Sequence, residues 1–143
     1  MVVKTFRGLL ADGGQDRIRL QTIKGKVGYR ITKFNVITET PTTVSAESVV
    51  QVWKTSQGTP VATINFTDSD LLGVGLWTSN DDTATQPDDM TIIFDNEIFN
   101  QDIFITHQNS SGSAGCNYYL ELEVIPLDDA GAEYTTLKDM RQT

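Results

Sequence analysis

The stretch NYYLELEVIP, residues 117–126, decides the fold class of this chain. Its even-numbered positions from 118 to 124 are all apolar or aromatic, whereas its odd-numbered positions include Glu121 and Glu123. An apolar residue at every second position is typical of a β-strand with one buried face. The stretch therefore predicts an antiparallel strand between a core and a polar surface.

The same period of two recurs near the start of the chain. Segments 3–10 (VKTFRGLL) and 16–23 (DRIRLQTI) both read as strands. Between them lies Ala11-Asp12-Gly13-Gly14, whose glycines supply the positive φ angles of a tight turn. We expect these two strands to form a hairpin.

Further strands follow along the chain. Alternation within 27–37 slips by one position, which predicts a bulge or a bend between two sheets. Segment 68–79 (DSDLLGVGLWTS) is the one stretch that could form a short helical turn. The remaining predicted strands are 49–55, 61–66, 90–95 and 97–107.

Eight or nine short strands separated by turn signals predict an all-β protein. We expect a single domain over residues 1–143, a jelly-roll-like antiparallel β-sandwich of about eight short strands. Residues 1–8 and 132–143 would serve as terminal arms or edge strands.

Composition narrows the function classes. One cysteine permits no intrachain disulfide, and no apolar run resembles a signal peptide or a membrane span. We expect a soluble protein that is made in the cytoplasm and is not secreted. The net charge of −8 argues against nucleic-acid binding.

The charge is divided unevenly along the chain. Residues 1–66 carry nine Lys/Arg and four Asp/Glu, and residues 67–143 carry two Lys/Arg and fifteen Asp/Glu. One interpretation is charge-complementary packing of copies or of partners, through basic strands that include Arg17, Arg19 and Arg30. The other is that strands of the two halves interleave and the difference averages out.

Candidate catalytic and metal-binding residues are few. His107 and Cys116 flank a predicted loop and form the minimum pair for a thiol nucleophile, but no orienting or oxyanion motif accompanies them. We predict no enzyme and no cofactor. A structural calcium ion is the one metal considered, held by loop carboxylates among Asp68, Asp70, Asp81, Asp82, Asp88, Asp89, Asp95 and Glu97.

Large aromatic residues are candidate interface anchors as well as core residues. Trp77 and Tyr119 are the two that we single out for a surface role, because adjacent Tyr118 and Tyr119 must point to opposite faces of a strand.

Three segments together carry a family resemblance: TFRGLLADGGQDRIRL (5–20), TIIFDNEIFNQDIFITH (91–107) and CNYYLELEVIPLDDAGAEYTTLKDMR (116–141). The chain resembles small virion structural proteins of marine tailed bacteriophages. The resemblance implies a capsid decoration or cement protein on the surface of the phage head. It also implies the major capsid protein and further copies of the chain as partners, with a homotrimer favoured.

Two alternatives remain open. A tail- or head-fibre module could bind a host-surface glycan through Trp77 or Tyr119. A head–tail or tail-tube component could assemble the same sandwich into a ring, with loop 80–89 (NDDTATQPDD) for stacking.

Overall fold

The computed structural model describes residues 2–20, 27–39, 46–79, 88–94, 98–110 and 114–126. In these ranges the chain forms eight strands and no helix. A three-stranded sheet, the small sheet, has the order β1-β8-β3, and a five-stranded sheet, the large sheet, has the order β2-β7-β4-β5-β6. The strands are β1 (Val2–Leu10), β2 (Gln15–Ile18), β3 (Val27–Thr38), β4 (Ala46–Trp53), β5 (Leu71–Ser79), β6 (Asp88–Ile93), β7 (Ile103–Asn109) and β8 (Cys116–Pro126).

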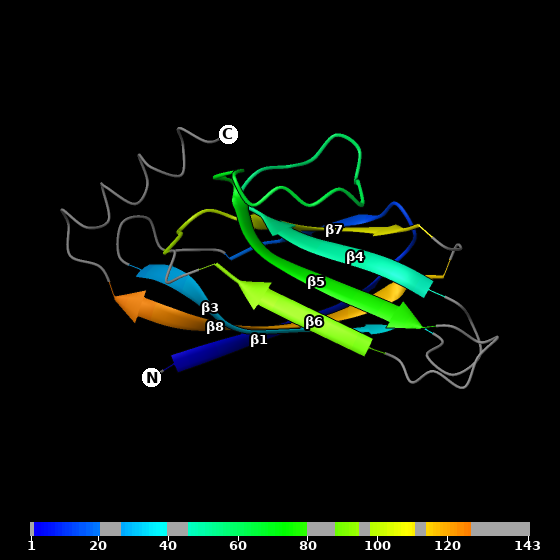
Figure 1. Ribbon diagram of the computed structural model, residues 1–143. Helices are drawn as coiled ribbons and strands as arrows, with labels where there is room; N and C mark the ends of the chain where they lie inside the picture. Colours follow the sequence, from blue (N-terminus) through cyan, green and yellow to red (C-terminus); the bar gives the residue numbers. More distant parts are fainter. Residues whose placement is uncertain are drawn as a thin grey trace.

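The two sheets stack face to face with the apolar core between them (Figure 1). All pairings are antiparallel, so the prediction of an all-β sandwich is confirmed. Three strands face five, and the jelly-roll connectivity stays a prediction. No helix in the described ranges is long and apolar enough to cross a membrane.

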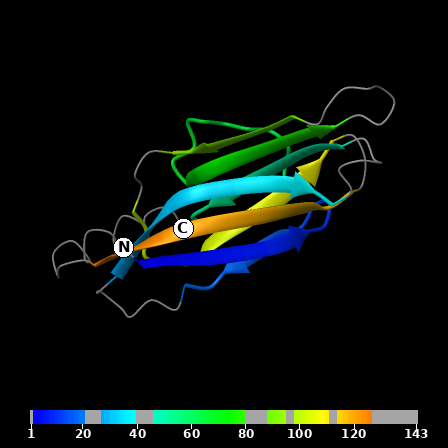
Figure 2. The ribbon, with the colours of Figure 1, turned by 90° about the horizontal axis from the view of Figure 1, so that it is seen from below.

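Strand β8 has the two faces that its sequence predicts. Tyr118, Leu120 and Leu122 are buried in the core, whereas Glu121 and Glu123 lie on the outer side of the small sheet. β8 is the central strand of that sheet, between β1 and β3 (Figure 2). The slip predicted in β3 is also confirmed, as a register shift between Ile31 and Lys33 within one sheet.

β3 and β5 pack closely where β5 carries glycine. A Cβ atom on Gly75 would lie 2.8 Å from Val36 Cγ1 and 3.2 Å from Phe34 Cε2, so a larger residue would collide with β3. The prediction of a helical turn in 68–79 is therefore wrong for most of the segment, which is strand β5 from Leu71 onward. In the sequence the glycines of this segment argue against a longer helix, whereas in the structure Gly75 allows β3 and β5 to pack together.

The predicted hairpin between the first two strands is wrong. The turn is present, with Gly13 at a φ of 76°, but β1 pairs with β8 and β2 pairs with β7. The turn thus carries the chain from one sheet to the other. The predicted strand at 61–66 is also absent, and these residues belong to the connection between β4 and β5.

Strands of the basic and acidic halves of the chain interleave. Acidic β8 lies between basic β1 and β3, and Glu123 pairs with Arg30 while Glu121 lies 3.9 Å from Lys33 Nζ. The pairing confirms the averaging interpretation for the small sheet. Residues 132–143 lie outside the described residues, and residues 2–8 belong to β1, an edge strand.

Candidate protein-binding face

The large sheet is apolar on both sides. Its inner residues Val50, Val52 and Ile105 join the main core, whereas Trp53, Leu71 and Val74 form a second buried cluster on the outer side. This explains why VVQVW in β4 reads as a nearly continuous apolar run. A second buried cluster requires something to cover the outer side of the sheet.

The cover is the connection between β4 and β5, residues 54–70, which we call the strap. In Figure 1 it forms the long loop above β4 and β7. A backbone hydrogen bond joins the two ends of the strap: the Lys54 amide donates to the Asp70 carbonyl at 2.9 Å. Thr55 Oγ1 also donates to Asp70 Oδ2 at 3.2 Å, and burial raises the pKa of the Asp70 carboxyl above its usual value.

Two glutamines of the large sheet form hydrogen bonds with the backbone of the strap. Gln51, which is fully buried, donates from Nε2 to the carbonyls of Val61 (3.1 Å) and Thr63 (3.2 Å). Gln15 donates from Nε2 to the Gln57 carbonyl at 3.1 Å and accepts from the Gln57 amide at 2.8 Å. Three strap carbonyls and one strap amide are therefore bound by side chains of the large sheet rather than by a neighbouring strand.

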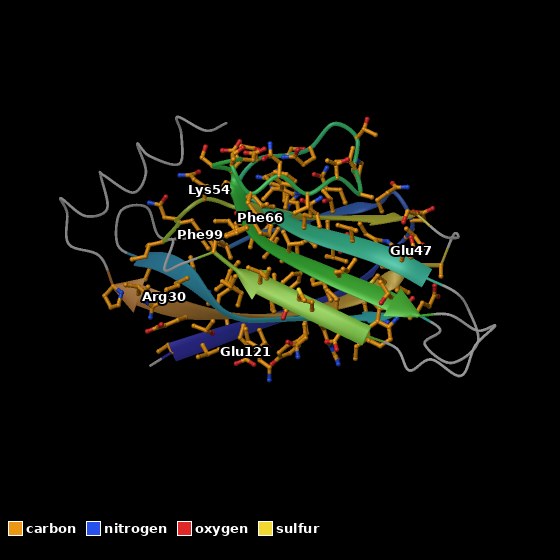
Figure 3. All side chains as sticks on the ribbon, in the orientation of Figure 1. Arg30, Glu47, Lys54, Phe66, Phe99 and Glu121 are labelled. Carbon is orange, nitrogen blue, oxygen red and sulfur yellow. The ribbon has the colours of Figure 1, made fainter. Side chains whose placement is uncertain are left out.

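The strap and the neighbouring edge strand β6 expose large apolar side chains. We call the set Val61, Ile64, Phe66 and Met90 the strap patch. Phe66 and Met90 are 60% and 61% exposed, although Phe66 also contacts Phe94 edge-on with ring centroids 5.1 Å apart. Figure 3 shows Phe66 and Glu121 on different sides of the sandwich, with the charged outer side of the small sheet around Glu121. Met90 faces Leu76 on β5, on the outer side of the large sheet, which is the side that the strap covers. Exposed apolar side chains on such a surface are typical of protein-binding regions.

The arginines predicted to meet an acidic neighbour lie on two different sheets or next to them. Arg17 projects from the outer side of β2, where it pairs with Asp102 at 2.8 Å and lies over the Phe104 ring at 6.0 Å. Arg19 follows β2 and is exposed. Arg30 projects from the outer side of β3 in the small sheet and pairs with Glu123. The fold therefore does not gather these three cations into one patch.

The two aromatic candidates have different environments. Trp77 is 9% exposed and belongs to the main core between the sheets, so its ring is not available for a surface contact. Tyr119 lies on the outer side of the small sheet, where Lys33 Nζ is 6.0 Å from the ring centroid. Of the two predicted residues, Tyr119 is therefore the one that can make a surface contact. The prediction failed for Trp77 because sequence alternation alone does not show which face of β5 is covered.

The His107–Cys116 pair is enclosed in the protein. Both side chains are fully buried, and His107 Nδ1 lies 3.1 Å from the Ala11 carbonyl. Burial raises the pKa of the Cys116 thiol to about 11. At neutral pH the sulfur is therefore a protonated thiol, a poor nucleophile.

The acidic calcium candidates are described only in part. Asp70 donates its backbone amide to Asp68 Oδ1 at 3.0 Å, an interaction that closes a local turn. Within the described residues no three His, Cys, Asp or Glu side chains gather as metal ligands would. The remaining candidates are exposed Asp89, the strand residue Asp88, whose side chain is not described, and Asp81, Asp82, Asp95 and Glu97, which lie outside the described residues, as does most of loop 80–89.

Sequence reasoning missed the strap patch. The signal that was present is the length of the connection, because turn residues at 56–60 and 67–70 flank VATINF on both sides. Comparison with known proteins adds no assignment: no family model, no curated protein and no solved structure matches this chain.

Proposed function

We propose that this chain is a non-enzymatic structural protein of a virion, of the capsid decoration or cement type. In this role it packs on the major capsid protein and stabilises the phage head. The strap patch is the observation that supports a packing role most directly, because Phe66 on the anchored strap and Met90 on strand β6 each expose more than half of their surface.

The physical argument rests on rigidity as well as on exposure. The strap is anchored at both ends and in its middle, so little conformational entropy remains to be lost when a partner covers it. Phe and Met are enriched at the centres of protein interfaces. Exposed apolar side chains on an anchored strap suit a partner surface that is itself ordered, such as a folded capsid subunit.

Immunogold electron microscopy of particles of the phage that encodes the chain tests the location. We expect label spread over the heads. Label restricted to tails would transfer the chain to a fibre or adaptor role, and particles that lack the chain altogether would overturn the virion assignment.

A competition experiment tests the surface. Purified heads are incubated with labelled wild-type protein and with the double variant Phe66→Ser/Met90→Ser, and we expect the variant to lose binding. The double variant Leu9→Ser/Ile37→Ser is the matched control, because Leu9 (51%) and Ile37 (52%) are similarly exposed on the outer side of the small sheet. Equal binding by wild type and the strap variant would reject the strap patch as the contact, provided that thermal unfolding shows both variants folded.

A further inference from the structure

Strand β1 presents an open edge. It pairs with β8 over its whole length, from Val2 to Leu10, and none of the described residues pairs with its other edge. The opposite edge of the small sheet is not open in the same way, because β3 lies against β5 and β6 and bridges to Phe99. Figure 2 shows β1 as the outermost strand of its sheet. The small sheet thus ends in a row of backbone groups that can accept another strand.

This edge lacks most of the features that protect edge strands from pairing. β1 is nine residues long, contains no proline and has no register shift against β8. The protective feature that β1 does have is an inward-pointing charge: Lys4 lies on the inner side of the strand. Its ammonium group, however, reaches across β8 to within 5.6 Å of the Tyr29 ring centroid, away from the open edge. Val2 and Val3 are 62% and 37% exposed beside it.

We propose that β1 pairs antiparallel with β1 of a second copy across a two-fold axis, with Thr5 facing Thr5. Directly opposed residues in an antiparallel pair lie on the same side of the sheet, so in a symmetric pair their numbers are both odd or both even. The residue midway between them therefore faces the same residue of the second copy. Lys4 or Arg7 at that position would put like charges together. With Phe6 at that position, Val2 would have to face Leu10 of the second copy. Leu10 is buried where the chain turns into β2.

The Thr5 register also distributes the remaining side chains favourably. On the outer side it places Val3 opposite Arg7 of the second copy, and on the inner side it places Lys4 opposite Phe6. Glu123 is the β8 neighbour of Val3, so Arg7 of the second copy approaches a carboxylate one strand away. The two small sheets become one continuous six-stranded sheet. This contact uses a different surface from the strap patch and differs from the three-fold contact that the phage resemblance implies.

Measurement of the mass of the purified full chain tests this proposal, by light scattering after size exclusion over a range of concentrations. We expect a dimer for the wild type. Thr5→Lys and Thr5→Glu, measured separately, should each weaken the dimer by about tenfold or more, since each places like charges opposite each other. An equimolar mixture of the two variants should regain the dimer mass, because only the mixed pair opposes unlike charges.

Matched controls address folding and nonspecific charge effects. Asn35→Lys adds the same charge to an exposed position on β3 of the same sheet and should leave the dimer intact. Thr5→Cys should form an intermolecular disulfide under mild oxidation, whereas Asn35→Cys should not. The native Cys116 is fully buried and does not compete.

A wild-type chain that stays monomeric at every concentration would overturn the proposal. So would a dimer or trimer whose mass does not respond to Thr5→Lys, together with a Thr5→Cys variant that fails to cross-link. None of these outcomes depends on binding to heads, so this contact and the strap-patch function can fail independently.

Discussion

Tyr118 and Asp16 join the two sheets through one hydrogen bond: the phenol of Tyr118 on β8 donates to Asp16 Oδ2 on β2 at 3.0 Å. The ring of Tyr118 also lies against Gly8, where an added Cβ atom would be 2.8 Å from the phenol oxygen. Burial raises the pKa of Tyr118, and the adjacent Asp16 carboxylate raises it further. The neutral phenol is therefore the form that the folded protein requires.

Replacing Tyr118 with Phe removes this bond and keeps the ring. We expect the free energy of unfolding to fall by about 1.5–3 kcal/mol, the range for a hydrogen bond to a charged group. Urea unfolding followed by tryptophan fluorescence measures the change. Tyr119→Phe is the matched control, because Tyr119 lies on the outer side of the same strand. An equal loss in both variants would contradict a specific role for the Tyr118–Asp16 bond.

Enlarging Gly75 tests the close approach of β3 and β5. Gly75→Ala places a methyl group 2.8 Å from Val36 Cγ1, and overpacking of this kind costs about 1–3 kcal/mol. Gly58→Ala is the control, because nothing lies within 4 Å of an added Cβ atom on this strap glycine. We expect Gly58→Ala to be neutral or slightly stabilising in the same urea titration. If Gly75→Ala and Gly58→Ala lowered the free energy of unfolding equally, the loss at Gly75 could not be attributed to a collision with Val36.

Removing the buried amide of Gln51 should loosen the strap without unfolding the sandwich. Gln51→Leu leaves the carbonyls of Val61 and Thr63 without their donor, so we expect local opening of residues 54–70. Limited proteolysis with fragment masses should show faster cleavage within the strap. Gln101→Leu, at an exposed position, is the control and should leave the cleavage rate unchanged. Cleavage that accelerates equally throughout the chain would indicate global destabilisation instead.

Cys116 should be inert in the folded protein and should make stability depend on alkaline pH. Burial raises the pKa of its thiol from 9.0 to about 11, so the unfolded chain ionises first. The contribution of the protonated thiol is complete below pH 9 and is lost as pH rises through about 11. We expect the free energy of unfolding to decrease in this window, and to decrease less in Cys116→Ala.

A thiol reagent provides an independent measurement at neutral pH. The native protein should react slowly, and denaturant should release one reactive thiol, since the chain has one cysteine. Fast stoichiometric labelling of the folded protein would contradict the burial of Cys116.

The sequence was most informative where the period of two coincided with one covered face. In β8 the alternation around Leu120 and Glu121 predicted both faces correctly. It was less informative where pairing partners are distant: Gly13 and Gly14 predicted a turn, but a turn does not specify whether its flanking strands share a sheet. Local pattern also failed for the strap, because the Gln51 amide, which lies in β4, satisfies carbonyls that a neighbouring strand would otherwise bind.

The candidate site was harder to predict than the fold. Trp77 and Phe66 are both aromatic and both lie near turn-rich segments, yet Trp77 is in the core and Phe66 is 60% exposed. The difference depends on position in the fold: Trp77 lies on the inner side of β5, whereas Phe66 lies on the strap outside the sheets. Neither property is encoded within a few residues of the side chain concerned.

The central position of β8 determines the order in which the protein can assemble. β1 and β3 do not pair with each other, and both pair with β8, which begins at Cys116. During synthesis the small sheet therefore cannot form until nearly all of the described chain has left the ribosome, whereas β4 and β5 can pair much earlier. In that interval β1 and β3 both lack β8, the strand with which each of them pairs, and chaperone capture or premature association of nascent chains would compete with folding at this stage.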